Sequence, residues 1–384
     1  MTNPSNQQHN PATRPPDEKP LRILFAGGGT GGHIFPAMAV ADAFIRLYPH
    51  AQVRFAGSSY GLESRVVPQR GFRLYRIAVR GLFQVSWRRR LWVAAMLPVA
   101  FLQSIAALVT FRPHVVIGVG GYASGPVMAT AVLLGFKTVI QEQNAYPGMT
   151  NRILGRFVRL AFVPMEGLER FFRRAVVISN PVRPDIMAIR EQKDRREGPP
   201  LVFVFGGSQG AHVLNEAMKE ALPRLVKWGG EVKILHQTGP AELGAVQEAY
   251  RSIEGSTKIQ ATVVPFVEEM DQALAQCRVV VGRAGASGVA ELVAARRPSV
   301  LVPIPGTSGD HQLRNAQWLA QAGASVLLEQ SRLNGERLAE ILVELLDDPA
   351  RLKAMEKAAD GLFTGDAAQQ VALQCLELLG RKNG

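Results

Sequence analysis

Residues 21–37 read LRILFAGGGTGGHIFPA, and this stretch decides how the chain folds. Its first five residues are mostly large and apolar, which is typical of a buried strand. Five glycines and one threonine follow at residues 27–32, and the apolar periodicity of residues 34–47 predicts a helix. A strand, a glycine turn and a helix in this order open a doubly wound α/β domain.

The same turn is suited to binding an anion. Glycine allows the backbone to approach a ligand closely, and a helix start offers free N–H groups at the positive end of its dipole. His33 lies where the turn becomes the helix. An imidazole at the mouth of an anion site is a candidate general base. The alternative is that His33 only begins the helix and bonds its own backbone.

A nicotinamide-binding enzyme is a rival interpretation. Gly27, Gly29 and Gly32 also spell G-x-G-x-x-G, the dinucleotide fingerprint. That fingerprint expects an acidic residue at the end of the second strand, about 20 residues further on. The second strand is expected at residues 53–57, VRFAG, and no acid ends it. The missing acid disfavours a nicotinamide enzyme.

Composition narrows the class of protein. A chain of 384 residues with 47% hydrophobic and 20% charged residues is long enough for two globular domains. The net charge of +12 predicts an acidic partner: nucleic acid, anionic lipid or a phosphorylated substrate. The two cysteines, Cys277 and Cys375, form neither a disulfide framework nor a zinc pattern, which favours a reducing compartment. Residues 1–20 lack an apolar segment and are expected to be a disordered tail, not a signal peptide.

Strands and glycine turns recur along the first half. The strand expected at residues 115–119 runs into GGYASGP, and the strand at residues 137–141 ends in Glu-Gln-Asn. Ligands bind at the carboxyl ends of strands in such sheets. The prolines of NPVRP at residues 180–184 and the charged run to Gly198 then predict a domain boundary.

The second half repeats this pattern. A strand at residues 201–205 leads into GGSQG, and a strand at residues 279–281 leads into GRAGASGVAE. Glu291 lies one turn inside the helix that follows. An acid there can accept hydrogen bonds from sugar hydroxyls. The alternative role is that of an N-terminal dipole partner, which contributes about 0.3–1 kcal/mol.

A long apolar segment with basic and aromatic neighbours suggests contact with a membrane. Residues 91–109 carry no charge, although Pro98 and two polar residues interrupt them. A helix that crosses a bilayer needs about 20 such residues, so a helix partly exposed at a membrane surface fits better. A true span and a solvated basic loop beside a core helix are the alternatives. The interfacial residues would be Arg80, Phe83, Trp87, Arg88, Arg89, Arg90 and Trp92.

Seven motifs in order resemble one family closely. GGGTGGHIFPA, GGYASGP, QEQN, NPVR, GGSQGA, RAGASGVAE and DHQLRNA follow the order and spacing of the MurG family, over about residues 21–380. The resemblance implies a GT-B fold, in which two doubly wound Rossmann-like domains face a cleft. It implies inverting transfer of N-acetylglucosamine from UDP-N-acetylglucosamine to undecaprenyl-pyrophosphoryl-N-acetylmuramyl-pentapeptide, in peptidoglycan synthesis.

The resemblance also implies roles for residues in the matching motifs. His33 would be the base, with Asp310 and Glu142 as the alternatives. Family members often have His where this chain has Gln141 and Thr where it has Gly288. The expected acceptor contacts are Gly29, Tyr122 and Ser124. The expected donor contacts are Thr30, Gly31, Gly32, Asn144, Arg183, Ser208, Val267, Ala286, Ser287, Gly288, Val289, Ala290, Glu291 and Gln312.

The domain boundaries and the location follow from the same comparison. The N-terminal domain is expected at residues 21–179 and the C-terminal domain at 199–361. Residues 180–198 would link them, and residues 362–384 would form a helix that returns to the first domain. The enzyme would be peripheral on the cytoplasmic side of the cell inner membrane and would not bind nucleic acid. No Asp-x-Asp or His/Cys ligand set occurs in the sequence, so no metal and no cofactor are expected.

Overall fold

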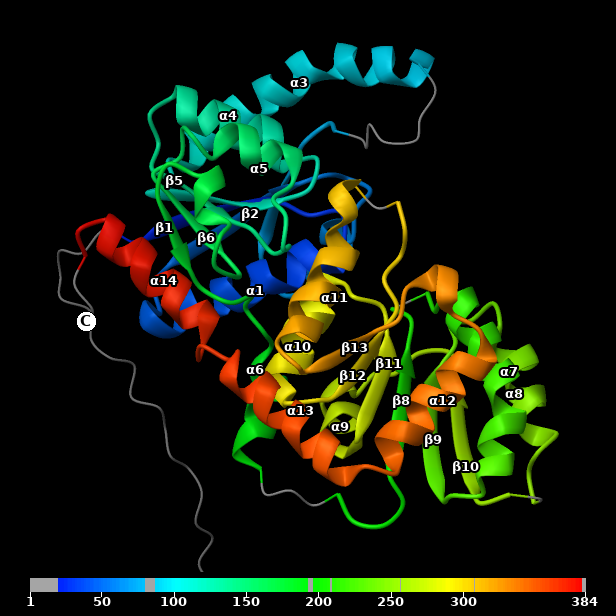
Figure 1. The fold of residues 1–384 in the computed structure, drawn as a ribbon. Helices are drawn as coiled ribbons and strands as arrows, with labels where there is room; N and C mark the ends of the chain where they lie inside the picture. Colours follow the sequence, from blue (N-terminus) through cyan, green and yellow to red (C-terminus); the bar gives the residue numbers. More distant parts are fainter. Residues whose placement is uncertain are drawn as a thin grey trace, which may run out of the picture.

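Two parallel sheets, each covered by helices, form the chain in the computed structural model (Figure 1). The structure describes residues 20–79, 87–192, 196–207, 209–255, 257–306 and 308–381, with only the backbone of residues 87–95 and 308. The seven-stranded sheet belongs to the first half of the chain and the six-stranded sheet to the second. The α/β class and the pair of Rossmann-like units predicted from the glycine turns are confirmed.

The N-terminal sheet has the order β3-β2-β1-β4-β5-β6-β7, and all its neighbouring strands are parallel. Chain order reverses beside β1, so β1 and β4 flank the point where such sheets bind ligands. The strands are β1 (Arg22–Gly27), β2 (Gln52–Gly57), β3 (Arg73–Arg76), β4 (Val115–Gly120), β5 (Thr138–Gln141), β6 (Leu160–Val163) and β7 (Ala175–Val177).

The C-terminal sheet has the order β10-β9-β8-β11-β12-β13 and is also parallel. Its reversal lies between β8 and β11, the two strands that precede the third and fourth glycine turns. The strands are β8 (Leu201–Phe205), β9 (Val232–Gln237), β10 (Ile259–Val264), β11 (Val279–Gly282), β12 (Ser299–Leu301) and β13 (Ser325–Leu327).

Helices begin close to where the sequence predicts them, with some shifted ends. The first helix takes in Gly31 and Gly32, because residues in the glycine turn already adopt helical geometry. The long apolar helix is longer than its uncharged segment. The α-helices are α1 (Gly31–Leu47), α2 (Glu63–Gln69), α3 (Trp87–Phe111), α4 (Ser124–Leu133), α5 (Met149–Leu154), α6 (Pro184–Met187), α7 (His212–Trp228), α8 (Leu243–Arg251), α9 (Met270–Gln276), α10 (Ala286–Ala295), α11 (His311–Gln321), α12 (Gly335–Leu346), α13 (Pro349–Gly361) and α14 (Ala367–Leu378).

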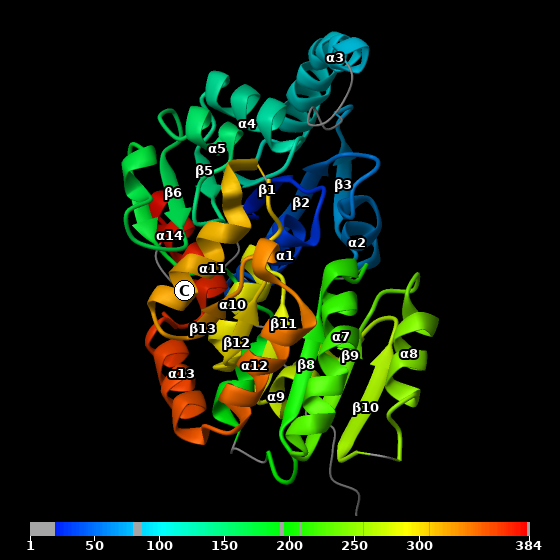
Figure 2. The ribbon, with the colours of Figure 1, turned by 45° about the vertical axis from the view of Figure 1, so that its right-hand side comes forward.

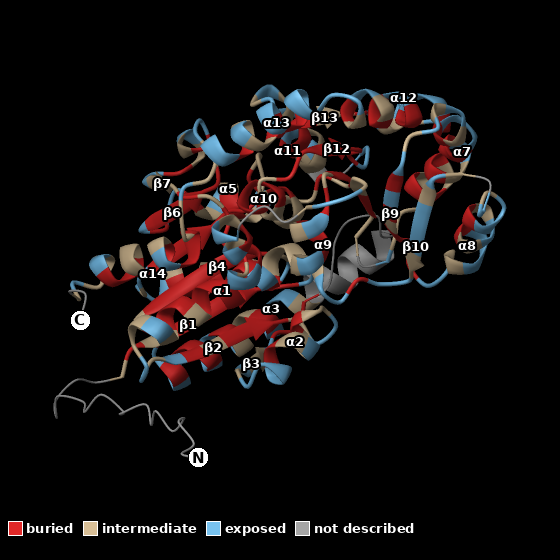
Figure 3. Ribbon diagram, turned by 90° about the horizontal axis from the view of Figure 1, so that it is seen from below, coloured by how far each residue is buried: buried red, intermediate tan, exposed pale blue. Residues whose placement is uncertain are grey.

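Each half has a buried core between its sheet and its helices. The central strands are almost entirely buried, as Figure 3 shows for β1 and β4. Phe25 of β1 and Phe55 of β2 stack with their ring centroids 5.1 Å apart. Burial of such aromatic and aliphatic surface supplies most of the stabilising free energy, at about 25 cal/mol per Å².

The chain crosses between the two halves twice: the first crossing lies between β7 and β8, and the second lies between α13 and α14. On the first crossing, Val182, Ile186 and Ile189 are buried in the core of the C-terminal half, so most of the expected linker packs as part of that half. On the second crossing, α14 leaves α13 and packs its buried side chains against the N-terminal half (Figures 1 and 2). The two halves are therefore held by two separate segments of chain.

Candidate functional site

The first two glycine turns pack directly against each other. The Gly28 amide donates to the carbonyl of Gly120, with 3.2 Å between nitrogen and oxygen. A Cβ on Gly121 would lie 2.1 Å from the carbonyl oxygen of Gly28. Gly28 and Gly121 also have positive φ angles of 141° and 81°, which side chains disfavour. Only glycine fits these positions, and the contact joins the carboxyl ends of β1 and β4.

His33 lies beside this contact and has a defined hydrogen-bond partner. Its Nδ1 is 3.0 Å from Oε1 of Gln143. The Gln143 side chain donates from Nε2 to the carbonyl of Gln141 at 3.0 Å, so its oxygen faces His33 as an acceptor. Nδ1 of a neutral His33 must then carry the proton, which leaves Nε2 as a proton acceptor. A Cβ on Gly120 would come within 2.9 Å of the imidazole ring, so the ring needs a glycine there.

Glu63 fixes the first glycine turn through a hydrogen bond. Its side chain belongs to α2 and only 1% of its surface is exposed. The carboxylate accepts hydrogen bonds from the Gly29 amide at 2.6 Å and from the amide and hydroxyl of Ser58 at 2.8 and 2.7 Å. Backbone N–H donors stabilise a buried carboxylate in place of a cation. The loop that leads to His33 is thereby fixed.

The two acids expected as alternative bases differ from His33 in their surroundings. The buried carboxylate of Glu142 accepts from the amides of Gln143, Asn144 and Gly148, and from the side chains of Asn144 and Asn151. Its oxygens are thus already engaged in holding their own loop. Asp310 is exposed at the N-terminus of α11. Of the three candidates, His33 has the geometry that suits a base.

Residues of the two halves meet at the N-termini of α1 and α10. The Ser287 hydroxyl lies 3.5 Å from the carbonyl oxygen of Gly32. Asn315 bridges the halves, because its Oδ1 accepts from the Ala145 amide at 2.9 Å and its Nδ2 donates to the Ala284 carbonyl at 3.0 Å. Two positive helix ends therefore lie next to each other where the halves meet, an arrangement that favours a ligand with negative charge.

Glu291 lies on α10 beside the first crossing. Its Oε1 is 3.6 Å from Nε of Arg183, whose Nη1 is 3.8 Å from Asp185. The Glu291 side chain is 21% exposed. Burial raises the pKa of Glu291 to about 7; Arg183 opposes this shift and Asp185 adds to it. The carboxyl group of Glu291 thus titrates near neutral pH on α10, close to the N-terminus of that helix. Shifted pKa values of this kind are common in functional sites.

The other expected site residues have varied surroundings. Tyr122 is 46% exposed, while Ser124 is fully buried and its hydroxyl has no partner among the described residues. The Val267 amide donates to Oε1 of Gln237 at 3.0 Å. Gln312 accepts from the Ile304 amide at 3.1 Å. Ser208 lies outside the described residues.

One group of side chains in the described part of the chain has the spacing of a metal site. Ligand atoms of His212 and Glu216, on α7, and of Glu242, just before α8, lie within 4.8 Å of one another. Lys219 already pairs with Glu216 at 2.7 Å, and His212 bonds Glu242. These pairs explain the cluster as a set of surface ion pairs, so we assign it no metal.

Three residues that organise the site were not predicted from the sequence. Gln143 lies inside the QEQN motif and bonds His33, but the motif alone gave no reason to choose it over its neighbours. Glu63 lies two residues after a single glycine, in a segment whose pattern is that of an ordinary surface helix. No motif includes it. Asn315 belongs to the DHQLRNA motif, and only the folded structure places it opposite Ala145.

The fold and the paired helix N-termini are those of a two-domain glycosyltransferase, and comparisons with known proteins agree. Residues 23–163 match the glycosyltransferase family 28 N-terminal domain, and residues 201–371 match the family 28 C-terminal domain. A solved structure of Acinetobacter baumannii MurG is 28% identical with a TM-score of 0.76, over 94% of this chain and 99% of that one.

Curated relatives narrow the family further. A protein of Anaeromyxobacter sp. (strain K) is 42% identical over 95% of this chain and 94% of its own length. A protein of Myxococcus xanthus is 41% identical over 94% of this chain and 93% of its own. Both are named UDP-N-acetylglucosamine--N-acetylmuramyl-(pentapeptide) pyrophosphoryl-undecaprenol N-acetylglucosamine transferase. The chain belongs to the MurG family, as its motifs predicted.

The contact between Gln143 and His33 predicts one imidazole tautomer. In ¹⁵N nuclear magnetic resonance spectra above the histidine pKa, His33 should carry its proton on Nδ1. Gln143→Leu should abolish this preference, because the fixed acceptor is gone. Gln103→Leu, a change at a glutamine that bonds Ala78 in another part of the domain, is the control and should leave the His33 signals unchanged. An Nε2-protonated His33 in the unmodified protein would contradict the assignment.

Proposed function

We propose that this chain transfers N-acetylglucosamine from UDP-N-acetylglucosamine to undecaprenyl-pyrophosphoryl-N-acetylmuramyl-pentapeptide, which converts lipid I to lipid II in peptidoglycan synthesis. The relatives that carry this activity in their names align with nearly the whole chain. The observation that carries the proposal is the meeting of the N-termini of α1 and α10, with His33 beside it and its Nδ1 held by Gln143.

Each half has one substrate in this proposal. The C-terminal half binds the UDP-sugar: the start of α10, from Ala286 to Ala290, faces the diphosphate, and Glu291 accepts from the ribose hydroxyls. Arg183, Val267, Gln312 and the turn at Ser208 complete this side. The N-terminal half binds the lipid-linked acceptor between its two glycine turns, near Gly29, Tyr122 and Ser124, while Thr30, Gly31, Gly32 and Asn144 reach the donor from the opposite side.

The reaction is one displacement with inversion at the anomeric carbon. His33 Nε2 takes the proton of the acceptor hydroxyl while its oxygen forms the new bond to the sugar. The bond from that carbon to the diphosphate breaks, and UDP leaves with the electron pair. Gln143 accepts from Nδ1–H and keeps the imidazole oriented. The N–H groups of α10 and the guanidinium of Arg183 stabilise the charge that develops on the diphosphate.

A transfer assay with a His33 variant tests this function. The unmodified protein should move labelled N-acetylglucosamine from UDP-N-acetylglucosamine to a short-chain lipid acceptor. His33→Ala should lower kcat by about 10²- to 10⁴-fold, because general-base catalysis contributes that much, and should leave UDP affinity nearly unchanged. Normal turnover in this variant would remove His33 from the mechanism. Absence of transfer by the unmodified protein would refute the function itself.

The ionisation of Glu291 predicts how donor binding depends on pH. A carboxylate accepts from both ribose hydroxyls, and its pKa of about 7 means that acidification removes this form. The dissociation constant of UDP-N-acetylglucosamine, whose diphosphate does not titrate here, should rise by about tenfold from pH 8 to pH 6. Glu291→Gln should bind weakly at both pH values and lose the dependence, while His33→Ala should keep it. Affinity that is constant across this range would contradict the ribose assignment.

We also infer that the end of the N-terminal half furthest from the C-terminal half rests on an anionic membrane surface. Val99, Leu102, Ile105 and Val109 recur every three or four residues on α3, so they form one exposed apolar stripe. Figure 1 shows α3 beside α4 at this end of the molecule. None of the helices in the described part of the chain has the length and apolar character that a membrane crossing needs.

The structure does not describe the side chains of the basic and aromatic residues that are expected to assist membrane binding. Arg80 and Phe83 fall outside the described residues, and the side chains of Trp87, Arg88, Arg89, Arg90 and Trp92 are not described. Their part in binding remains a prediction from the sequence. The anionic leaflet would attract them with about 1 kcal/mol each, and salt would screen that attraction.

Vesicle binding tests the apolar stripe. Leu102→Ser with Val109→Ser should lower affinity for anionic vesicles by at least about tenfold, because each exposed side chain loses its apolar burial in the interface. UDP affinity should stay the same, which shows that the variant is folded. High salt should release the unmodified protein only partly. Unchanged vesicle affinity in the double variant would exclude α3 as the contact.

A further inference from the structure

A strongly basic hollow lies apart from the place where the N-termini of α1 and α10 meet. It has a volume of about 1270 Å³, and its walls come from the first crossing, the end of α9, the end of α10 and one face of α13. The candidate site uses the N-terminus of α10, and the hollow uses its C-terminus. A helix of ten residues is about 15 Å long, so the hollow and the candidate site are separate.

Cations outnumber acids in the walls of this hollow. Among the lining residues that the structure describes, six are basic and three are acidic, which leaves an excess of three positive charges. Arg196 pairs with Glu356 at 2.6 Å, and Arg190 pairs with Asp360. Lys353 and Lys357 lie one turn apart and exposed on α13, and neither has an ion pair within the described part of the chain. The basic residues are Arg190, Arg196, Arg296, Arg297, Lys353 and Lys357.

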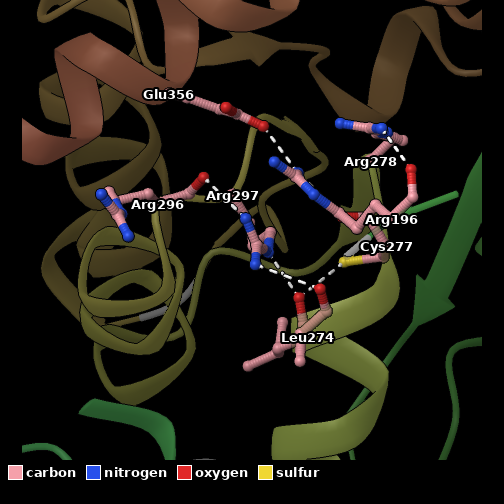
Figure 4. A network of polar contacts seen from close by, with 8 residues as sticks. Arg196, Leu274, Cys277, Arg278, Arg296, Arg297 and Glu356 are labelled. Carbon is pink, nitrogen blue, oxygen red and sulfur yellow. Dashed lines mark hydrogen bonds and ion pairs between the residues drawn. The ribbon is translucent and has the colours of Figure 1, made fainter. Parts of the chain in front are cut away.

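Each arginine that lines this hollow is already held by a backbone carbonyl or a carboxylate. Figure 4 shows Arg196 directed toward Glu356, and Arg297 directed toward the carbonyl of Leu274 at the end of α9. Arg297 is only 6% exposed. Arg296 donates to the carbonyl of Arg190 at 2.7 Å. Guanidinium groups that are already oriented lose little conformational entropy when an anion binds.

Arg190 connects this hollow to both crossings of the chain. It lies on the first crossing, and its Nη1 donates to the carbonyls of Val293 and Ala294 at 3.2 and 3.1 Å. Its guanidinium carbon lies 3.9 Å from the ring centre of Phe363, which belongs to the second crossing. Asp360, its acidic partner, lies at the end of α13 just before that crossing. An anion in the hollow would compete with Asp360 for this guanidinium.

We propose that this hollow is a second anion site, which binds a chain of two or more phosphates and, through Arg190, changes how tightly the two crossings are joined. Arginine and lysine are the usual ligands of phosphate oxygens. The charge excess and the volume both exceed what a single phosphate needs. Free inorganic polyphosphate and the phosphate tail of a nucleotide share this chemistry.

Calorimetric binding of tripolyphosphate tests the site. The titrations contain no UDP, because a nucleoside diphosphate could itself occupy the hollow; the double variants report whether the hollow is the place of binding. Lys353→Ser with Lys357→Ser should weaken binding by at least about tenfold, because it removes two charges from the wall at positions that make no ion pair. The control Lys233→Ser with Lys258→Ser removes the same charge from two other exposed positions. Lys233 lies on β9 and Lys258 lies just before β10, so this change should have no effect on binding.

The outcomes separate a built site from general attraction. Equal loss in both double variants, unchanged binding in the Lys353/Lys357 double variant, or no binding to the unmodified protein would overturn the proposal. A repeat titration with adenosine triphosphate distinguishes the two sources: tighter binding than tripolyphosphate would favour a nucleotide, and weaker binding would favour inorganic polyphosphate.

Hydrogen exchange tests the link to the crossings. Tripolyphosphate should increase amide exchange at residues 361–366 in the unmodified protein, because Arg190 is drawn from Asp360. In Asp360→Asn, exchange there should be high already and respond little to the ligand. Binding without any change in exchange would overturn the link to the crossings. Neither measurement uses sugar transfer, so both stand apart from the proposed activity.

Discussion

Close contact between the first two glycine turns is the constraint on which the N-terminal half of the site depends. The carbonyl of Gly28 occupies the space that a side chain on Gly121 would need, and the His33 ring occupies the space beside Gly120. Any side chain at these positions would push β1 and β4 apart at their carboxyl ends. His33 would then lose Gln143, which reaches it from the end of β5. The orientation of one imidazole thus depends on the absence of Cβ atoms in a neighbouring loop.

Buried acids fix the loops of this site without cations. Glu63 accepts from Gly29 and Ser58 and so ties the first glycine turn to the loop after β2, while Glu142 accepts from amides of its own loop. Hydrogen-bond donors of this kind replace the water that burial removes from a carboxylate. Glu291 differs, since burial raises its pKa and Arg183 only partly compensates. The first two acids shape the site, and the third is free to respond to a ligand.

The two halves are tied by polar contacts and by α14. Ser287 approaches Gly32, Asn315 bonds Ala145, and α14 carries the chain back to the N-terminal half. Polar contacts of this kind are individually weak, with a net contribution of about 0.5–1.5 kcal/mol each. Weak ties are compatible with the domain opening that many enzymes use to admit substrate.

The sequence alone determined the architecture and the family of this protein. Strand, turn and helix are local patterns, so the apolar runs and glycine turns predicted both sheets and most helices. Seven ordered motifs identified the family, and they also located His33 and Glu291. Even so, the start of α1 and the three-residue strand β13 were not predicted, because short elements depend on their neighbours in the sheet.

Only the tertiary structure decided which groups touch. Gln143 lies 110 residues from His33, Glu63 lies 34 residues from Gly29, and Asn315 lies 170 residues from Ala145. The basic hollow likewise joins residues from the first crossing with residues of α13 that follow more than 150 positions later. A residue type and its local spacing carry no information about such partners. Hydrogen bonding and charge compensation act over a few ångströms, and folding alone brings these side chains within that distance.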